Sequence, residues 1–149
     1  MKNADSQTDD NVGKPRDIAE RTFEFAVRII LLCGKMDERG RIGRVMMSQI
    51  LRAGTSIPAN VEEAQAALSK ADFVSKLSIA LKEARETHLR LRLLATARIF
   101  SDKQLQPLIR EIEEIRRVLG AIIVSAKRGG EARFFNFAFL IDECPPPTR

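Results

Sequence analysis

The fold of this protein is decided by one stretch, Leu77-Ser-Ile-Ala-Leu-Lys-Glu-Ala-Arg-Glu-Thr-His-Leu-Arg-Leu-Arg-Leu-Leu94. Within it, apolar and small residues recur at intervals of three and four positions, at Leu77, Ala80, Ala84, Thr87, Leu91 and Leu94. This spacing places them along one face of an α-helix, the face that packs against other helices. The stretch therefore predicts an amphipathic helix that starts near the cap-like sequence Ser69-Lys-Ala-Asp72.

Three other segments carry the same spacing. The first begins at a capping-box sequence, Asp17-Ile-Ala-Glu20, and its stripe is formed by Ala19, Thr22, Ala26, Ile29, Cys33 and Met36. The second has its stripe at Met46, Ile50, Ala53, Ile57, Val61, Ala64 and Leu68. The last begins near Ser101 and Gln104, and its stripe is formed by Leu105, Leu108, Ile112, Ile115, Leu119, Ile122 and Ala126. Four amphipathic helices with short connectors predict an all-α, antiparallel up-down-up-down four-helix bundle.

The second of these segments contains a proline, Pro58. Proline removes one backbone hydrogen bond, and its ring crowds the carbonyl four residues earlier, where this chain has Gly54. Because glycine has a permissive backbone, we predict one kinked second helix rather than two helices that meet at Ser56.

The 149-residue chain divides into three parts. Residues 1–16 are polar and are predicted to be a disordered N-terminal segment, and residues 17–128 form the bundle domain. Residues 129–149 are a Phe/Pro-rich C-terminal tail, in which Phe135, Phe137, Phe139 and Ile141 alternate as in a strand. The N-terminus has no signal-peptide pattern, and the longest apolar runs are too short to span a bilayer. With only Cys33 and Cys144 as thiols, the sequence predicts a cytoplasmic protein with no membrane contact.

The sequence lacks the side-chain patterns of the common enzyme classes. His88 is the only histidine, so neither a di-iron bundle site nor a zinc site of ordinary spacing can be assembled. The adjacent pairs Glu62-Glu63 and Glu113-Glu114 point about 100° apart on a helix and make no carboxylate dyad. We therefore predict no catalytic residues, no metal site, no cofactor and no enzymatic activity. His88 itself lies on the apolar stripe and is predicted to be a hydrogen-bonded core residue.

Two stretches carry a resemblance to a known family. They are Gln49-Ile-Leu-Arg-Ala-Gly-Thr-Ser-Ile-Pro-Ala-Asn-Val-Glu-Glu63, and Phe73 with the run from Leu77 to Leu94. Together they resemble the bacterial four helix bundle protein family, first named for proteins encoded by intervening sequences in ribosomal RNA genes. The chain departs from the family pattern at Glu62-Glu63-Ala64, where Ala-Glu-Gly is usual, and at His88-Leu89-Arg90, where aromatic residues are common. The phenylalanine-rich tail lies outside the pattern.

The resemblance implies a homo-oligomer, commonly a ring of five chains, without known enzymatic activity. The bundle is also similar to the accessory variability protein of diversity-generating retroelements, a basic pentamer that works with a reverse transcriptase and nucleic acid. That similarity implies RNA or DNA, or a protein such as a reverse transcriptase, as a partner.

An oligomer interface is predicted on the third helix. Ile79, Leu89 and Leu93 lie on the side away from its apolar stripe, where a single bundle would leave them in water. The alternative is that the tail folds back and covers them. Asn60 and Glu63 belong to the family motif, and they are predicted to contact a neighbouring subunit or, for Asn60, backbone groups freed by Pro58. The alternative is that the two residues mark a binding groove.

Basic residues give the bundle domain its charge, since residues 17–128 contain 20 basic and 14 acidic side chains, a net charge of +6. Several arginines lie in windows without acidic residues. The arginines predicted to bind nucleic-acid phosphates are Arg39, Arg41, Arg44, Arg52, Arg85, Arg90 and Arg92. Contact through phosphates would be sequence-tolerant. No aromatic platform for base stacking interleaves these arginines, and the alternative is a solvated basic face that aids solubility. The alternative function is a protein-interaction adaptor that uses the aromatic tail or the ring surface.

Overall fold

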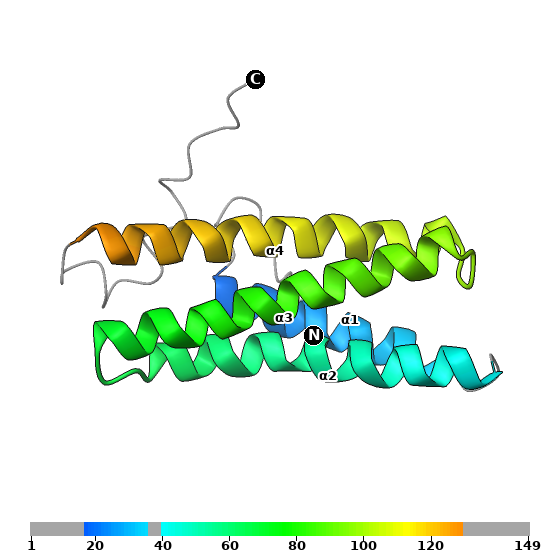
Figure 1. Cartoon of the computed structure of the whole chain (residues 1–149), viewed down its shortest axis with the longest axis horizontal. Coiled ribbons are helices and arrows are strands. Elements are labelled where there is room, and N and C mark those ends of the chain that lie inside the picture. The colour runs from blue at the N-terminus through cyan, green and yellow to red at the C-terminus, as the bar shows by residue number, and fades with distance from the viewer. Residues whose placement is uncertain (1–16, 36–39, 130–149) are drawn as a thin grey trace, which may run out of the picture.

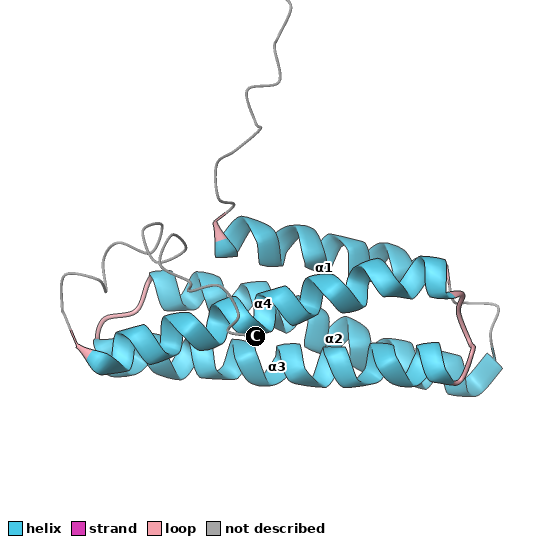
Figure 2. Cartoon of the chain, turned by 90° about the horizontal axis from the view of Figure 1, so that it is seen from above, coloured by secondary structure: helices cyan, strands magenta, loops and turns pink. Residues whose placement is uncertain are grey.

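The computed structural model describes residues 17–35 and 40–129. Its helices are α1 (Ile18–Gly34), α2 (Gly40–Gln65), α3 (Lys70–Thr96) and α4 (Asp102–Arg128). Successive helices run antiparallel and pack side by side, and α4 returns to contact α1 (Figure 1). The view turned by 90° shows the four helices gathered into one bundle (Figure 2). The predicted all-α four-helix bundle is therefore confirmed.

Polar side chains at the predicted positions begin three of the helices. The Asp17 carboxylate accepts a hydrogen bond from the Ala19 N–H at 3.3 Å, at the start of α1. The Ser69 hydroxyl accepts one from the Asp72 N–H at 3.1 Å, at the start of α3. At the start of α4, the backbone N–H of Ser101 donates to the Gln104 side chain at 3.4 Å. Each cap satisfies a backbone or side-chain group at an otherwise open helix end.

The core lies along the helix stripes that the sequence predicts. Buried members from all four helices form one apolar cluster, among them Ile29, Ile50, Ile57, Leu77, Leu91, Ile112 and Leu119. The stripe assignment is wrong at Leu68, which is 98% exposed because α2 ends at Gln65 and the helical spacing stops there. The first stripe also omits Phe25, which is buried between the predicted positions.

Pro58 lies inside a single continuous α2, as predicted, and two helices meeting at Ser56 are not formed. The helix passes very close to α1 at Gly54, where an added Cβ would lie 3.0 Å from Cγ2 of Ile29. One turn after Ser56, the Asn60 amide donates to the Ser56 carbonyl at 2.8 Å. No helix in the described ranges is long and apolar enough to cross a membrane.

Several predictions concern residues outside the described ranges. These are the disorder of residues 1–16, the stripe position Met36, the basic residue Arg39, and the tail beyond Gly129.

Candidate functional site

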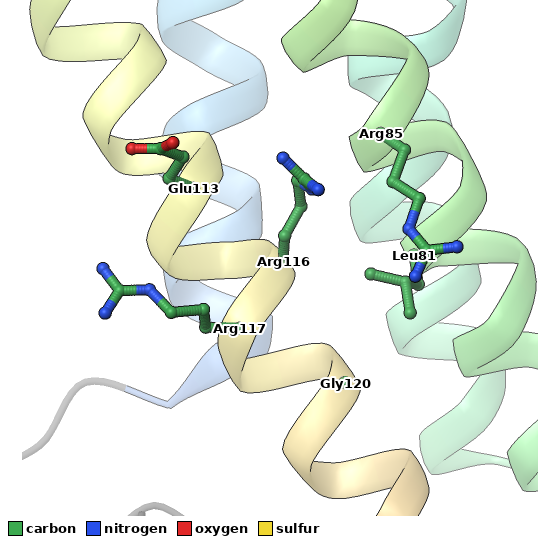
Figure 3. A pocket seen from close by; sticks show the side chains of 6 residues that line it. All are labelled: Leu81, Arg85, Glu113, Arg116, Arg117 and Gly120. Atoms are coloured by element: carbon green, nitrogen blue, oxygen red, sulfur yellow. The ribbon is translucent and has the colours of Figure 1, made fainter. Parts of the chain in front are cut away.

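The side of α3 that faces α4 carries a groove rich in arginine. A cavity of about 360 Å³ there is lined by Leu81, Arg85, Glu113, Arg116, Arg117 and Gly120 (Figure 3). A second cavity of about 280 Å³ in the same groove is lined by His88, Arg92, Ala95, Thr96, Gln106, Ile109 and Glu113. We call these two cavities together the α3–α4 groove. It brings together Arg85 and Arg92, which the sequence predicted as phosphate-binding, with Arg116 and Arg117, which it did not.

Ion pairing on the outer face of α4 departs from simple helix spacing. Spacing of four residues predicts that Glu113 pairs with Arg117 and Arg110 with Glu114. Instead, Arg117 pairs with Glu114, three residues before it. Glu113 turns toward α3, where its Oε1 lies 3.8 Å from Nε2 of His88. A contact with another helix thus decides which carboxylate faces the groove, and helix spacing alone does not predict it.

His88 is buried, with 8% of its surface exposed, and it contacts α4 through Arg116. The Arg116 Nη1 atom lies 2.6 Å from His88 Nδ1. Because a guanidinium can only donate, Nδ1 must accept, so the neutral ring carries its proton on Nε2. Burial lowers the pKa of His88, and the positive charges of Arg116 and Arg92 lower it further, while Glu113 opposes them. The predicted hydrogen-bonded core histidine is confirmed.

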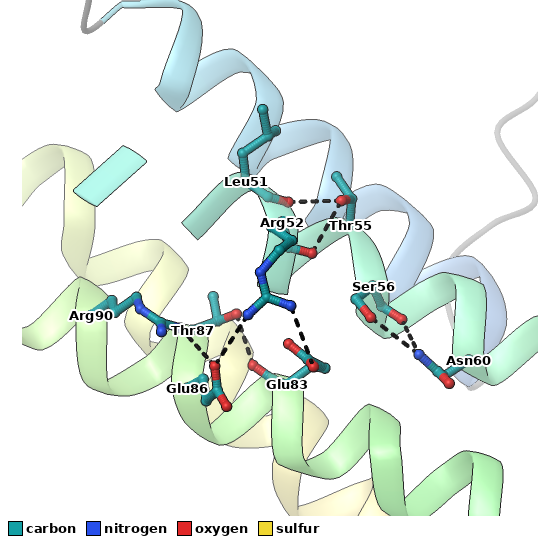
Figure 4. Close-up of polar contacts among 9 residues, drawn as sticks. All are labelled: Leu51, Arg52, Thr55, Ser56, Asn60, Glu83, Glu86, Thr87 and Arg90. Carbon is teal, nitrogen blue, oxygen red and sulfur yellow. Dashed lines mark hydrogen bonds and ion pairs between the residues drawn. The ribbon is translucent and has the colours of Figure 1, made fainter. Parts of the chain in front are cut away.

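On the α2–α3 side, two of the predicted arginines already face carboxylates (Figure 4). Arg52 lies 4.0 Å from Glu83 Oε1 and 3.7 Å from Glu86 Oε2. Arg90 donates to Glu86 Oε2 at 2.9 Å, and this hydrogen bond holds the pKa of Glu86 below its usual range. The charges of Arg52 and Arg90 are therefore largely compensated within the chain.

Arg41 and Arg44 lie in the first turns of α2, and both are exposed. No ion pair joins either of them to another residue in the described ranges. Among the predicted arginines, Arg41, Arg44 and the two groove residues Arg85 and Arg92 thus have no carboxylate partner in the described ranges. A phosphate would meet an uncompensated cation at these positions.

The predicted interface residues on α3 are exposed in the single chain, with Ile79 at 40%, Leu89 at 55% and Leu93 at 50%. Contacts between α2 and α3 fix the register of the two helices, because Arg52 lies against Glu86 and Arg90 against Gln49. This antiparallel register sets residue 45 opposite residue 94 and residue 60 opposite residue 79. Val45 and Ile42, exposed by 51% and 73%, therefore extend the apolar surface of Leu89 and Leu93. We call these four residues the α2–α3 patch.

The other two predicted interface residues lie along the same side of the bundle. Asn60 is half-buried and bonded to Ser56, and Glu63 is exposed and pairs with Lys76 of α3. Their contact with a second subunit stays a prediction.

A further apolar surface, which the sequence analysis missed, lies on α1. We call it the α1 patch, and it consists of Phe23, Val27, Ile30 and Leu31, which are 58%, 40%, 49% and 61% exposed. Leu51 of α2, at 37% exposure, lies on the neighbouring side, since α1 and α2 pack together near Gly54. The signal was present in the sequence, because positions 23, 27 and 30 repeat at intervals of four and three beside the core stripe.

Comparison with known proteins agrees with the resemblance drawn from the sequence. A search of curated proteins gave no match. Among solved structures, the chain is similar to a protein of unknown function from the S23 ribosomal protein family of Bacteroides thetaiotaomicron, with 42% sequence identity and a TM-score of 0.67. That similarity covers 71% of this chain and 97% of the other. The family model described as 23S rRNA-intervening sequence protein matches residues 14–121, from before α1 into α4, and the chain therefore belongs to this family.

Proposed function

We propose that the protein is a non-enzymatic, cytoplasmic homo-oligomer, most simply a pentameric ring, that binds nucleic acid through backbone phosphates. The observation that carries the proposal is the pair of exposed apolar patches on a strongly basic bundle. Monomeric proteins rarely leave several large apolar side chains grouped in water. The α1 patch and the α2–α3 patch together expose eight such side chains.

The placement of the two patches favours a ring. They involve different helices, so they pair most simply head to tail, with the α1 patch of one copy against the α2–α3 patch of the next. Such a heterologous contact closes a ring when the rotation between neighbours permits it. The two patches lie on neighbouring faces of the bundle and not on opposite ones. Each added copy is therefore rotated relative to the one before it, which favours a closed ring over a straight filament.

Charge supports nucleic acid as the partner. Each bundle domain has a net charge of +6, so the five bundle domains of a ring would together carry about +30. A surface of that charge attracts a phosphate backbone strongly at low salt, and binding weakens as salt rises because counterions are released. The resemblance to the accessory variability protein supports the same class of partner.

The test is a charge reversal on α2. In the variant Arg41→Glu/Arg44→Glu/Arg52→Glu, we expect binding of single-stranded RNA at low salt to fall about tenfold or more, because phosphate contacts supply the affinity. The mass of the oligomer should not change, since none of the three lies in an apolar patch. Arg41→Glu/Arg44→Glu is the cleaner pair, because Arg52→Glu also adds a carboxylate beside Glu83 and Glu86. RNA affinity equal to that of the wild type in a filter-binding assay would mean that these three arginines make no phosphate contacts, and wild-type protein that binds no RNA at low salt would remove the proposal.

The purified protein offers a simple check. It contains no tryptophan and no tyrosine, so its own near-ultraviolet absorbance is small. Nucleic acid that co-purifies with it is therefore visible directly in the absorbance spectrum.

The second candidate is an adaptor that holds a partner protein, such as a reverse transcriptase, through the aromatic tail or the ring surface. Four of the eight phenylalanines lie in the tail, an unusual density for a polar terminus. Deletion of residues 131–149 separates the two functions. We expect the shortened chain to keep its RNA affinity in the same filter assay. Loss of RNA binding on deletion would favour the tail as the binding element.

A further inference from the structure

We propose that the α3–α4 groove is the site where a backbone phosphate of the nucleic acid binds, between Arg85 of α3 and Arg116 of α4, with Arg117 at the rim (Figure 3). The inference rests on the proposed function and assigns it to one surface. The groove is distinct from the α2–α3 side, where Arg52 and Arg90 already face carboxylates.

The balance of charge in the groove favours an anion. Four arginines line its two cavities, against a single lining carboxylate, that of Glu113. Arg117 also pairs with Glu114 at the rim. No ion pair engages Arg85 or Arg92 within the described part of the chain. An incoming phosphate would therefore meet two cations, Arg85 and Arg92, that have no carboxylate partner in that part of the chain.

One donor in the groove, Arg116, is held in place. Contact with His88 Nδ1 fixes the Arg116 guanidinium in the gap between α3 and α4, where Figure 3 shows it pointing toward α3. Two buried atoms of this pair, Arg116 Nε and His88 Nε2, have no hydrogen-bond partner in the described structure. Buried donors without acceptors are rare in folded proteins, and a bound anion can supply the missing acceptor.

Glu113 is the residue that would respond to a phosphate. Its Oε1 is 3.8 Å from His88 Nε2, just beyond hydrogen-bond distance. A phosphate in the groove would repel this carboxylate toward His88, where it can accept the Nε2 hydrogen. Because the neutral ring is protonated on Nε2, the second proton must go onto Nδ1, the atom that accepts from Arg116. A phosphate that draws the Arg116 guanidinium toward itself frees Nδ1, and the closer carboxylate favours the protonated imidazole, so binding should raise the pKa of His88. The groups that face this ring are Arg92 on α3, and Arg116 and Glu113 on α4.

Gly120 leaves open space at the base of the α3–α4 groove. It lies inside α4, where glycine weakens a helix relative to alanine. A Cβ added there would have no atom within 4 Å, so packing does not require the glycine. Its missing side chain keeps the floor of the groove open for a ligand.

The decisive experiment compares matched variants of the full chain. The probe is fluorescently labelled single-stranded oligouridylate RNA, and its affinity is measured by anisotropy at several salt concentrations. Arg85→Gln/Arg117→Gln removes two exposed groove arginines, and Arg41→Gln/Arg44→Gln removes two exposed α2 arginines, so both pairs lower the charge equally. The groove pair should lose about tenfold or more in affinity, and its salt slope should fall by roughly 1.4, for two lost phosphate contacts. The α2 pair should lose clearly less.

A steric pair tests the site without changing charge. Gly120→Leu fills the floor of the groove and should weaken RNA binding, whereas Gly120→Ala should leave the affinity unchanged and raise the melting temperature. As the only histidine, His88 gives unambiguous ring signals by NMR. Its pKa should rise when RNA is added to the wild type, and not when RNA is added to Gly120→Leu.

The outcomes separate the inference from the proposed function. Wild-type protein that binds no RNA at low salt overturns both. Wild-type binding that survives the groove pair and Gly120→Leu, or that depends more on the α2 pair, overturns only the groove assignment. A change of oligomer mass in the groove variants would identify the groove as a subunit contact and would also overturn the assignment.

Discussion

The variant Leu89→Asp/Leu93→Asp is expected to behave as a single chain in solution. Both side chains are about half exposed in the isolated bundle, so aspartate there costs the monomer little. In the proposed ring they are buried against the α1 patch of a neighbour, where an unpaired carboxylate is costly. Light scattering should therefore report the mass of one chain, and circular dichroism should report an intact helical fold.

A control variant and a complementary variant sharpen this test. Leu68→Asp changes an equally apolar residue that is 98% exposed and lies beyond the end of α2, so it should leave the oligomer mass unchanged. Val27→Asp/Leu31→Asp removes the α1 patch and should also give single chains. In a head-to-tail assembly, each of the two monomeric variants keeps one intact patch. An equimolar mixture of them should therefore form a one-to-one dimer.

The mixture also distinguishes the kinds of contact. If each patch pairs with its own copy, either variant alone would still dimerise through the patch that it retains. Stable dimers of the separate variants would contradict the head-to-tail arrangement. An unchanged mass for Leu89→Asp/Leu93→Asp would contradict any interface on α3.

The variant Gly54→Val is expected to lower the free energy of unfolding by about 1–3 kcal/mol, the usual cost of overpacking a core. At this position even a Cβ would approach Ile29 Cγ2 to 3.0 Å and Cγ1 to 3.2 Å. Both helices are fixed by their other contacts, so α1 cannot move away without opening the core around Ile29. Urea denaturation of wild type and variant measures the loss.

The control removes side-chain bulk at Ile29 and adds it at Gly54, on the other side of the same contact. Ile29→Ala removes the two Cγ atoms that an added side chain would meet, and alone it should cost about 2–5 kcal/mol as a cavity. In the double variant Ile29→Ala/Gly54→Val, the valine fills part of that cavity. The double variant should therefore be more stable than the sum of the single losses predicts, by about 1–3 kcal/mol. Additive losses would mean that the two residues do not compete for the same space.

The fold was predictable because each helix buries one stripe, and the spacing of that stripe is local information. Ser69 and Asp17 likewise begin helices through bonds to residues two or three positions ahead. Leu68 shows where local spacing fails, since nothing in the stripe marks the end of α2 at Gln65.

The candidate site was only partly predictable, because it depends on contacts between helices. Arg52 and Arg92 look alike in the sequence, yet one faces Glu86 of α3 and the other lines the groove toward α4. Arg116 is fixed by His88, which is distant along the chain, and the pairing of Glu113 follows from the same contact. Such partners are set by the register of packed helices, which helical spacing does not specify.

The proposed assembly depends on apolar patches that one basic bundle cannot cover by itself. The most direct test is the solution mass of the full-length wild-type protein, measured by light scattering after size-exclusion chromatography with nucleic acid removed. We expect a mass several times the 16.7 kDa of one chain, and about five times for the expected ring. A mass of 16.7 kDa at micromolar concentration would contradict it.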